Sequence, residues 1–168
     1  MIPDRVLMYA SPFSYAGKVT RMKWAGYQID EDMIRKYMGA GLLENDSLMK
    51  LQGFLNYSDN DQREFLDKKE NLKQLLRVLF KIVEKTKANT EMLEFALLLI
   101  NGIFEDKRSR IRELVAMQKT TVEGNHLNAV GILQSFLIQH AEPGKEDQNQ
   151  MRDAASHTLA FLIQACDF

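Results

Sequence analysis

The apolar residues between Leu72 and Ile111 follow a helical period in two consecutive segments that are separated by a short polar joint. In the first segment they recur every three or four residues on one face: Leu72, Leu75, Leu76, Leu79, Phe80 and Val83. The second segment carries apolar residues on two sides: Met92, Phe95, Ala96, Leu99 and Ile103 on one, and Leu93, Leu97, Ile100 and Phe104 on the other. We therefore predict a helix with one buried face, followed by a helix that is covered on several sides.

This alternation of amphipathic and fully covered helices predicts the fold class. It is typical of stacked helical hairpins, in which each pair of helices leaves apolar surface for the next pair. Segments with period-two alternation are nearly absent, and only three prolines interrupt the chain. We expect an all-α protein, and specifically an armadillo- or HEAT-like solenoid of stacked hairpins. Residues 1–20 are expected to be an irregular lead-in, and residues 21–168 the helical solenoid domain.

Shorter helices are predicted on both sides of this central pair. Before it we expect helices over residues 19–27, 30–38 and 48–55, and a further helix that runs toward the apolar stripe. Ser58 and Asp61 are spaced like a capping pair for that last helix, and Asn71 is a candidate break. After the pair we expect a corner over residues 105–113, a modest helix through Ile111, Leu114 and Val115, and a helix within residues 123–140.

The final segment has the most regular stripe of all. Its members lie at i, i+3, i+4, i+7, i+8, i+11, i+12 and i+15: Met151, Ala154, Ala155, Thr158, Leu159, Leu162, Ile163 and Cys166. An apolar stripe of this length exceeds the small patches that isolated soluble domains tolerate. We therefore expect a carboxyl-terminal continuation or a partner to cover part of it, and the domain to be an incomplete version of a longer architecture.

Composition argues against several classes of protein. The net charge of −1 gives no basic field for nucleic acid, and no apolar run approaches the roughly 18 residues that span a bilayer. The amino terminus has Pro3 and Asp4 where a secretory signal would carry basic residues. A single cysteine excludes an intramolecular disulfide and fits a reducing, cytosolic location.

Candidate catalytic groups are few and scattered. His126, His140 and His157 are well separated in the sequence, and none has the helical spacing to a glutamate that marks a zinc site. Cys166 falls on the apolar stripe, where a cysteine behaves as a small hydrophobic residue. No glycine-rich phosphate-binding motif occurs. We expect no catalytic, cofactor or metal site, and the alternative is a small helical enzyme that uses Cys166 or a histidine.

Two groups of residues are candidates for binding a partner. A basic cluster at the corner comprises Lys107, Arg108, Arg110 and Arg112, interleaved with Glu105, Asp106 and Glu113. This cluster is either a solvated corner or a docking patch. The second group is Trp24 with Tyr27, beside Arg21 and Lys23, which is either a protein contact or an anchor of the first helix to the core.

The order of these features is similar to that of a known family. The opening comprises Arg21, Trp24, Tyr27 and the run IDEDMIRKY over residues 29–37. It is followed by LLRVLFKIVEKT over 75–86, MLEFALLLINGIFED over 92–106 and RSRI over 108–111. In this order the chain resembles, over roughly residues 20–165, the amino-terminal part of the H-subunit of the vacuolar-type proton-pumping ATPase.

The resemblance implies a non-catalytic regulatory or assembly subunit. Such a subunit would bind other subunits of the ATPase, especially the peripheral stator stalk, on the cytosolic face of acidic organelle membranes, and would support the coupling of ATP hydrolysis to proton transport. Family members have further repeats and a carboxyl-terminal helical domain, to which their inhibitory role is chiefly assigned, and we expect neither within these 168 residues. Lys23 stands where the family often has proline, and residues 39–48 have no clear counterpart. The alternative is a generic armadillo or HEAT adaptor in signalling or trafficking.

Overall fold

The computed structural model describes residues 44–85, 90–140 and 149–166. These residues form helices and no strand, which confirms the predicted all-α class. The chain divides into two compact units, Met1–Phe65 and Leu66–Phe168, and this boundary falls within the domain predicted over residues 21–168. The predicted lead-in and the predicted helices over residues 19–27 and 30–38 lie outside the described residues.

The first unit contains α3 (Asn45–Leu55) and most of α4 (Asp59–Asp67). The Ser58 hydroxyl oxygen accepts a hydrogen bond from the Asp61 backbone N–H at 3.2 Å, so the predicted capping pair at the start of α4 is confirmed. The two helices are joined by an aromatic contact, because the rings of Phe54 and Phe65 lie 5.4 Å apart. The side-chain amide of Gln62 also donates to the Phe54 carbonyl at 3.1 Å, which satisfies an acceptor at the end of α3.

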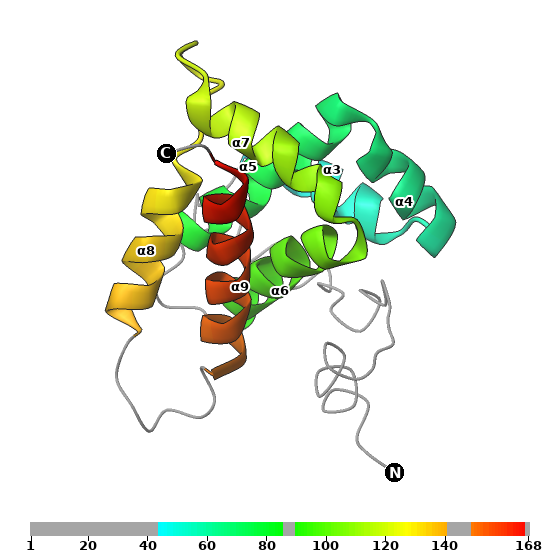
Figure 1. Cartoon of the computed structure of the whole chain (residues 1–168). Coiled ribbons are helices and arrows are strands. Elements are labelled where there is room, and N and C mark those ends of the chain that lie inside the picture. Colours follow the sequence, from blue (N-terminus) through cyan, green and yellow to red (C-terminus); the bar gives the residue numbers. More distant parts are fainter. Residues whose placement is uncertain (1–43, 86–89, 141–148, 167–168) are drawn as a thin grey trace. The chain divides into compact units, whose positions relative to one another are not determined.

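The second unit is built from five α-helices and one short 3-10 helix within the described residues (Figure 1). In chain order these are α5 (Lys69–Lys85), α6 (Thr90–Asp106), η3 (Arg108–Arg110), α7 (Ile111–Lys119), α8 (Ala129–Gln139) and α9 (Asn149–Ala165). The break before α5 lies at Lys68, between the end of α4 and the start of α5, and therefore precedes Asn71.

The two predicted central helices are α5 and α6, and their burial follows the sequence pattern. Both apolar sides of α6 are buried, and Met92, Ala96, Ile100, Ile103 and Phe104 are fully enclosed. The stripe on α5 is buried as predicted, but Val78 and Ile82 are buried as well. The buried face of α5 is wider than its stripe because this helix packs against α7 and α8 in addition to α6.

The helices of the second unit pack as two pairs that lie against each other. Helix α5 packs against α6, and α8 packs against α9. Between the pairs, α5 contacts α8 and α6 contacts α9, so each helix of one pair faces its counterpart in the other. Figure 1 shows α9 beside both α6 and α8.

Helix α8 is shorter than the segment predicted for it. It begins at Ala129, because the preceding residues form a loop in which Gly124 has a φ of +86°, a conformation that favours glycine. This loop is tied to α7 by a hydrogen bond from the Leu127 N–H to the Met117 carbonyl at 3.1 Å. Asn128 then caps α8, since its side-chain oxygen accepts from the Gly131 N–H at 3.1 Å.

The expectation that the stripe on the final helix lies uncovered is wrong for most of its length. Helix α9 packs against α6, α7 and α8, and these contacts bury Met151, Ala155 and Leu162. Leu162 has no exposed surface, whereas Ile163 at the edge of the stripe is 43% exposed. Helices α6, α7 and α8 of the same chain therefore supply most of the cover that was expected from a continuation or a partner.

Candidate functional site

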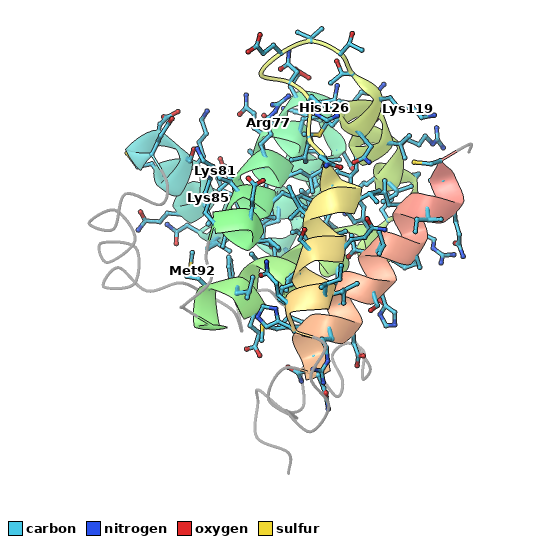
Figure 2. The ribbon with its side chains drawn as sticks, turned by 90° about the vertical axis from the view of Figure 1, so that its left-hand side faces the viewer. Arg77, Lys81, Lys85, Met92, Lys119 and His126 are labelled. Carbon is cyan, nitrogen blue, oxygen red and sulfur yellow. The ribbon has the colours of Figure 1, made fainter. Side chains whose placement is uncertain are left out.

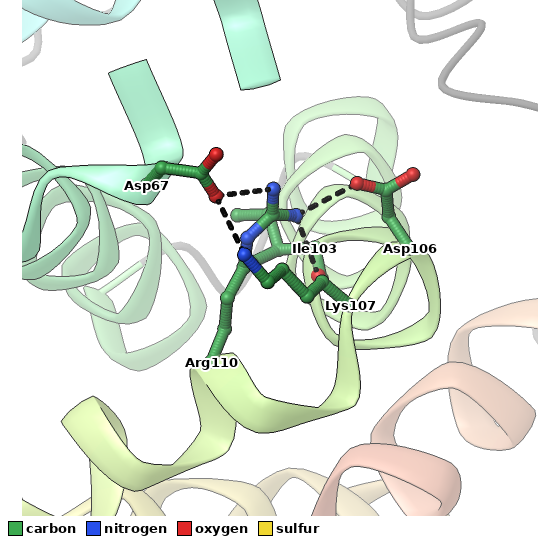
Figure 3. Close-up of polar contacts among 5 residues, drawn as sticks. All are labelled: Asp67, Ile103, Asp106, Lys107 and Arg110. Atoms are coloured by element: carbon green, nitrogen blue, oxygen red, sulfur yellow. Dashed lines mark hydrogen bonds and ion pairs between the residues drawn. The ribbon is translucent and has the colours of Figure 1, made fainter. Parts of the chain in front are cut away.

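The basic cluster at the corner between α6 and α7 is largely a structural ion-pair cluster. Figure 3 shows the Arg110 guanidinium between two carboxylates, those of Asp106 at 2.9 Å and Asp67 at 3.4 Å. The same guanidinium donates to the Ile103 carbonyl at 3.1 Å. Lys107 pairs with Asp67 at 3.3 Å. Only 5% of the Arg110 side chain is exposed, so this residue joins the corner to the end of α4 and is not presented to a partner.

The charges of this cluster stabilise the ionised form of Asp67. Desolvation by itself would raise the pKa of the Asp67 carboxyl. Hydrogen bonds and charge attraction from Lys107, and then from Arg110, outweigh desolvation and hold this pKa below its ordinary value of 3.8. The carboxylate therefore remains charged and paired at neutral pH.

The other residues of the predicted patches have different environments. The Arg108 guanidinium lies 4.5 Å from the centre of the Phe161 ring, which ties the corner to α9 by a cation–π contact. Arg112 is exposed on α7. Trp24 and Tyr27 lie outside the described residues. Arg108, Arg112 and the half-exposed Lys107 are therefore the accessible cations of the corner, whereas Arg110 is buried.

The histidines and the cysteine do not converge in one place. His140 stacks on Phe136 with ring centroids 4.3 Å apart, and its Nδ1 lies 3.0 Å from the Phe136 carbonyl oxygen. His126 and His157 are exposed on a loop and on α9, and Cys166 is a free, half-buried thiol. Within the described part of the chain, no three metal-binding side chains are gathered to hold a metal ion. None of the described helices is both long and apolar enough to cross a membrane.

A titratable group with a shifted pKa lies near the end of α6. The Glu105 carboxylate accepts a hydrogen bond from the Asn101 side-chain amide at 2.8 Å. Burial raises the pKa of the Glu105 carboxyl above its ordinary value, although the charge of His157 and the Asn101 hydrogen bond partly offset this effect. We assign this carboxylate no chemical role.

An open groove between α5 and α8 was not predicted from the sequence. It has a volume of about 320 Å³ and is lined by Val83, Glu84, Leu93, Asn128, Gly131, Ile132, Ser135, Phe136, Gln139 and His140. Its lining combines the buried apolar side chains of Val83, Leu93 and Phe136 with neutral polar side chains of α8. We refer to it as the α5–α8 groove.

Helix α5 also carries cations at regular spacing, none of which lines the groove. Arg77, Lys81 and Lys85 follow one another at intervals of four residues, which places them along one side of α5 (Figure 2). Arg77 donates to the Asn125 side-chain oxygen at 3.2 Å, so the row begins beside the loop that precedes α8. We call these three residues the α5 basic row.

The sequence of α8 contains one indication of this surface, namely the lack of charged residues. Its eleven residues, AVGILQSFLIQ, include no charged side chain, although part of the helix is exposed and Ile138 is 76% accessible. An outer helix of a soluble protein normally carries charges on its solvent side. The absence of charge, and not the charged corner, was the pattern that distinguished this surface.

Comparison with known proteins identifies no matching family model, no similar curated protein and no similar solved structure.

Proposed function

We propose that this chain is a non-catalytic, protein-binding module with an armadillo- or HEAT-like stack of helical hairpins. The contacts between the two helix pairs carry this proposal, because α5 faces α8 while α6 faces α9. Stacked repeats make this type of contact, in which equivalent helices of neighbouring repeats lie against each other. A nine-residue helix also precedes each pair in the chain: α4 comes before α5 and α6, and α7 comes before α8 and α9. This order fits repeats of two or three helices.

The complex in which we propose that it acts is a vacuolar-type proton-transporting ATPase. The support is the resemblance of the chain to the amino-terminal part of the H-subunit of that enzyme. The segments that carry the stronger part of the resemblance, over residues 75–86, 92–106 and 108–111, belong largely to α5, α6 and the corner at η3. In this proposal the chain binds the peripheral stator stalk on the cytosolic face of an acidic organelle. Its binding supports the coupling of ATP hydrolysis to proton transport.

The alternative function is a generic armadillo or HEAT adaptor in signalling or trafficking. The α5–α8 groove favours this alternative as much as the ATPase role, because a groove with a mixed apolar and polar lining can receive a segment of many partners. The two functions differ in the identity of the partner. Neither function involves a catalysed reaction.

Affinity purification of the native protein under mild conditions tests the choice between them. We expect subunits of the peripheral stalk to copurify in defined stoichiometry, and depletion of the protein to lower ATP-dependent acidification of organelle vesicles. Copurification of trafficking or signalling proteins without any ATPase component would support the adaptor instead. Unchanged acidification after complete depletion would contradict the ATPase proposal.

A second experiment tests the non-catalytic character. The purified chain is expected not to hydrolyse ATP, and Cys166→Ala is expected to rescue acidification in depleted cells as well as the wild-type chain does. The physical reason is that Cys166 is a free thiol that continues a stripe of apolar side chains at the end of α9. Loss of rescue by a variant with unchanged folding would revive the enzymatic alternative.

A further inference from the structure

Helix α5 carries five cations at one uninterrupted spacing. The three residues of the α5 basic row, Arg77, Lys81 and Lys85, are preceded at the same interval of four by Lys69 and Lys73. Residues four apart are neighbours on the surface of a helix, and like charges at this spacing destabilise it. Lys69 also places a positive charge in the first turn, where the helix dipole disfavours it. The row therefore lowers the stability of α5, and the packing of the second unit does not require it.

The carboxylates of α5 offset only part of this charge. Glu70 pairs with Lys73 at 3.9 Å, and Glu84 is the other acidic residue of the helix. Arg77 is held by a neutral group, the Asn125 side-chain oxygen. Within residues 44–85, 90–140 and 149–166, no ion pair joins Lys81 or Lys85 to a carboxylate. The last two turns of α5 thus carry unpaired positive charge.

The surroundings of the row keep it cationic. Helix α8, which packs against α5, contains no charged residue. Helix α7 also packs against α5 and ends at the exposed Lys119, which Figure 2 shows beyond the Arg77 end of the row. Glu123, in the loop after α7, adds one exposed carboxylate. Lys81 is half-exposed and Lys85 is exposed, so the row forms a cationic ridge on the surface.

The geometry of this ridge matches that of a second helix. At 1.5 Å per residue, successive cations are separated by about 6 Å along the axis, and each is rotated by about 40° from the one before. A helix with carboxylates at every fourth residue has the same repeat and the same inclination. When two helices cross at about −50°, their four-residue rows run parallel. Several ion pairs can then form in register.

Two other anionic partners fit the row less well. From Arg77 to Lys85 the row turns by about 80° around the helix, so a flat anionic membrane does not face all three cations equally. Single-stranded nucleic acid is bound by aromatic stacking platforms, and the one aromatic residue of α5, Phe80, is buried. The net charge of −1 also gives the chain no field that would attract a duplex.

We propose that the α5 basic row binds an acidic helix of a partner protein, with carboxylates at every fourth residue. These carboxylates face Arg77, Lys81 and Lys85 across the contact. The charges set the register of the partner and speed its association, since exposed ion pairs contribute more to specificity and association rate than to affinity.

This inference rests on the proposed function for its premise that the partner is a protein. The two fail in different experiments, because a synthetic helix tests the row without any ATPase subunit. Copurification of stalk subunits with a chain whose row binds no acidic helix would overturn the row alone. Binding of an acidic helix by a chain that copurifies with no ATPase component would overturn the assignment to that complex alone.

Three alanine-rich peptides of about 18 residues, long enough to form helices, serve as probes. The first has glutamates at intervals of four residues. The second has the same composition with the glutamates at intervals of five, which distributes them around the helix. The third has lysines in place of the glutamates of the first. In NMR titrations of the full chain at about 0.1 M salt, the first peptide is expected to shift the amide signals of α5 around the row. The second is expected to bind about fivefold more weakly, and the third not at all.

Charge reversal locates the contact. Lys81→Glu/Lys85→Glu is expected to weaken binding of the first peptide by about tenfold or more, with a smaller effect at higher salt. The lysine peptide is expected to bind this variant better than it binds wild type. The matched control is Arg108→Glu/Arg112→Glu, which reverses two exposed cations at the same interval in the corner. Both variants change the net charge equally, so the difference between them isolates the local contact. The control is expected to bind the first peptide within about twofold of wild type.

Thermal melting separates loss of binding from loss of the fold. Lys81→Glu converts two repulsive pairs, with Arg77 and Lys85, into attractive ones. Its Tm is therefore expected to rise by about 2 °C or more while its binding of the first peptide falls. Weaker binding by a more stable chain does not result from unfolding. A fall in Tm would contradict the premise that the row lowers the stability of α5.

Phosphatidylserine vesicles and single-stranded DNA are titrated in parallel. Stronger binding of either at the row would identify a membrane or a nucleic acid as the partner and overturn the proposal. Three further results would also overturn it: no shift of the α5 signals with the first peptide, equal binding of the first and second peptides, or equal weakening in the row variant and the control.

Discussion

Replacing Arg110 by methionine tests whether the corner between α6 and α7 is a structural ion-pair cluster. The substitution keeps most of the aliphatic volume of the side chain and removes its charge and its five donors. Arg110 is 5% exposed and binds Asp106, the Ile103 carbonyl and Asp67. We expect Arg110→Met to destabilise the second unit strongly without changing its helical content at low temperature.

The magnitude follows from these contacts. Loss of a charge-assisted hydrogen bond, such as that to Asp106 at 2.9 Å, costs about 1.5 to 3 kcal/mol. The Ile103 carbonyl loses a donor at a cost of about 1 kcal/mol, and the pair with the half-exposed Asp67 adds at most about 1 kcal/mol. The sum is about 3 to 5 kcal/mol, the range for breaking one side of a buried ion pair. At about 2 to 4 °C per kcal/mol for a chain of this size, Tm is expected to fall by roughly 6 to 20 °C.

Arg112→Met is the matched control. Arg112 lies two positions further along the chain and is exposed, so its replacement is expected to change the free energy of unfolding by no more than about 0.5 kcal/mol. Urea denaturation followed by circular dichroism measures both variants. If Arg110→Met unfolds at the same urea concentration as Arg112→Met, the ion-pair cluster does not stabilise the fold. The basic residues then form the solvated corner that the sequence left as an alternative.

The cluster also predicts a direction for acid sensitivity. The folded-state pKa of Asp67 lies below its ordinary value of 3.8, so its contribution to stability is fully present above that pH. The contribution is lost as the pH falls through the lower, folded-state value. Asp67→Asn is therefore expected to show a smaller loss of stability than wild type as the pH falls below about 4 in parallel urea titrations. An identical pH dependence would show that Asp67 is not held in its ionised form.

Three further predictions concern the helices of the second unit. Leu99→Ala is expected to cost about 2 to 5 kcal/mol in urea denaturation, because Leu99 is buried in α6, and an effect within about 0.5 kcal/mol would show that α6 is not enclosed. Burial raises the pKa of Glu105, so its stabilising contribution exists at acidic pH and is lost as the pH rises through the folded-state value. Glu105→Gln, which can still accept from Asn101, is therefore expected to raise Tm at pH 7 but not at pH 4, and a loss of Tm at pH 7 would contradict this. Asn128→Ala is expected to cost about 1 kcal/mol as a lost helix cap. In Gly131→Ala the added methyl carbon would lie 2.4 Å from the Asn128 side-chain nitrogen and would displace the cap. The double variant Asn128→Ala/Gly131→Ala should therefore be no less stable than Gly131→Ala alone. Additive losses of stability would refute the clash.

The helix positions in the second unit were accessible from the sequence because they depend on local periodicity. The apolar residues of α6 occupy two sides of the helix, and both sides are buried. The capping pair of Ser58 and Asp61 was likewise visible as a spacing of three residues. Helix α8 was predicted to begin too early, since leucine and valine continue the period through residues 123–130 while Gly124 and Asn128 set the actual loop and cap.

The candidate site was less accessible for a physical reason. A groove forms only where two helices pack side by side, and the pattern of apolar residues in α5 or α8 alone does not show that these helices face each other. The sequence offered one indirect signal, the lack of charge in α8, which describes the surface but not its neighbour. The basic cluster at the corner was the predicted docking patch instead, because a run of arginines looks the same in a sequence whether it is solvated or buried.

The sequence by itself therefore determined the helical class and most of the residues that the central helices bury, since both follow from the 3.6-residue period acting within one segment. Only the tertiary structure decided which helices cover one another. The stripe on α9 is closed by α6, α7 and α8, and Arg110 is neutralised by Asp67, a residue 43 positions away. Such pairings depend on packing among distant segments and on the desolvation of charges, which a local pattern does not encode.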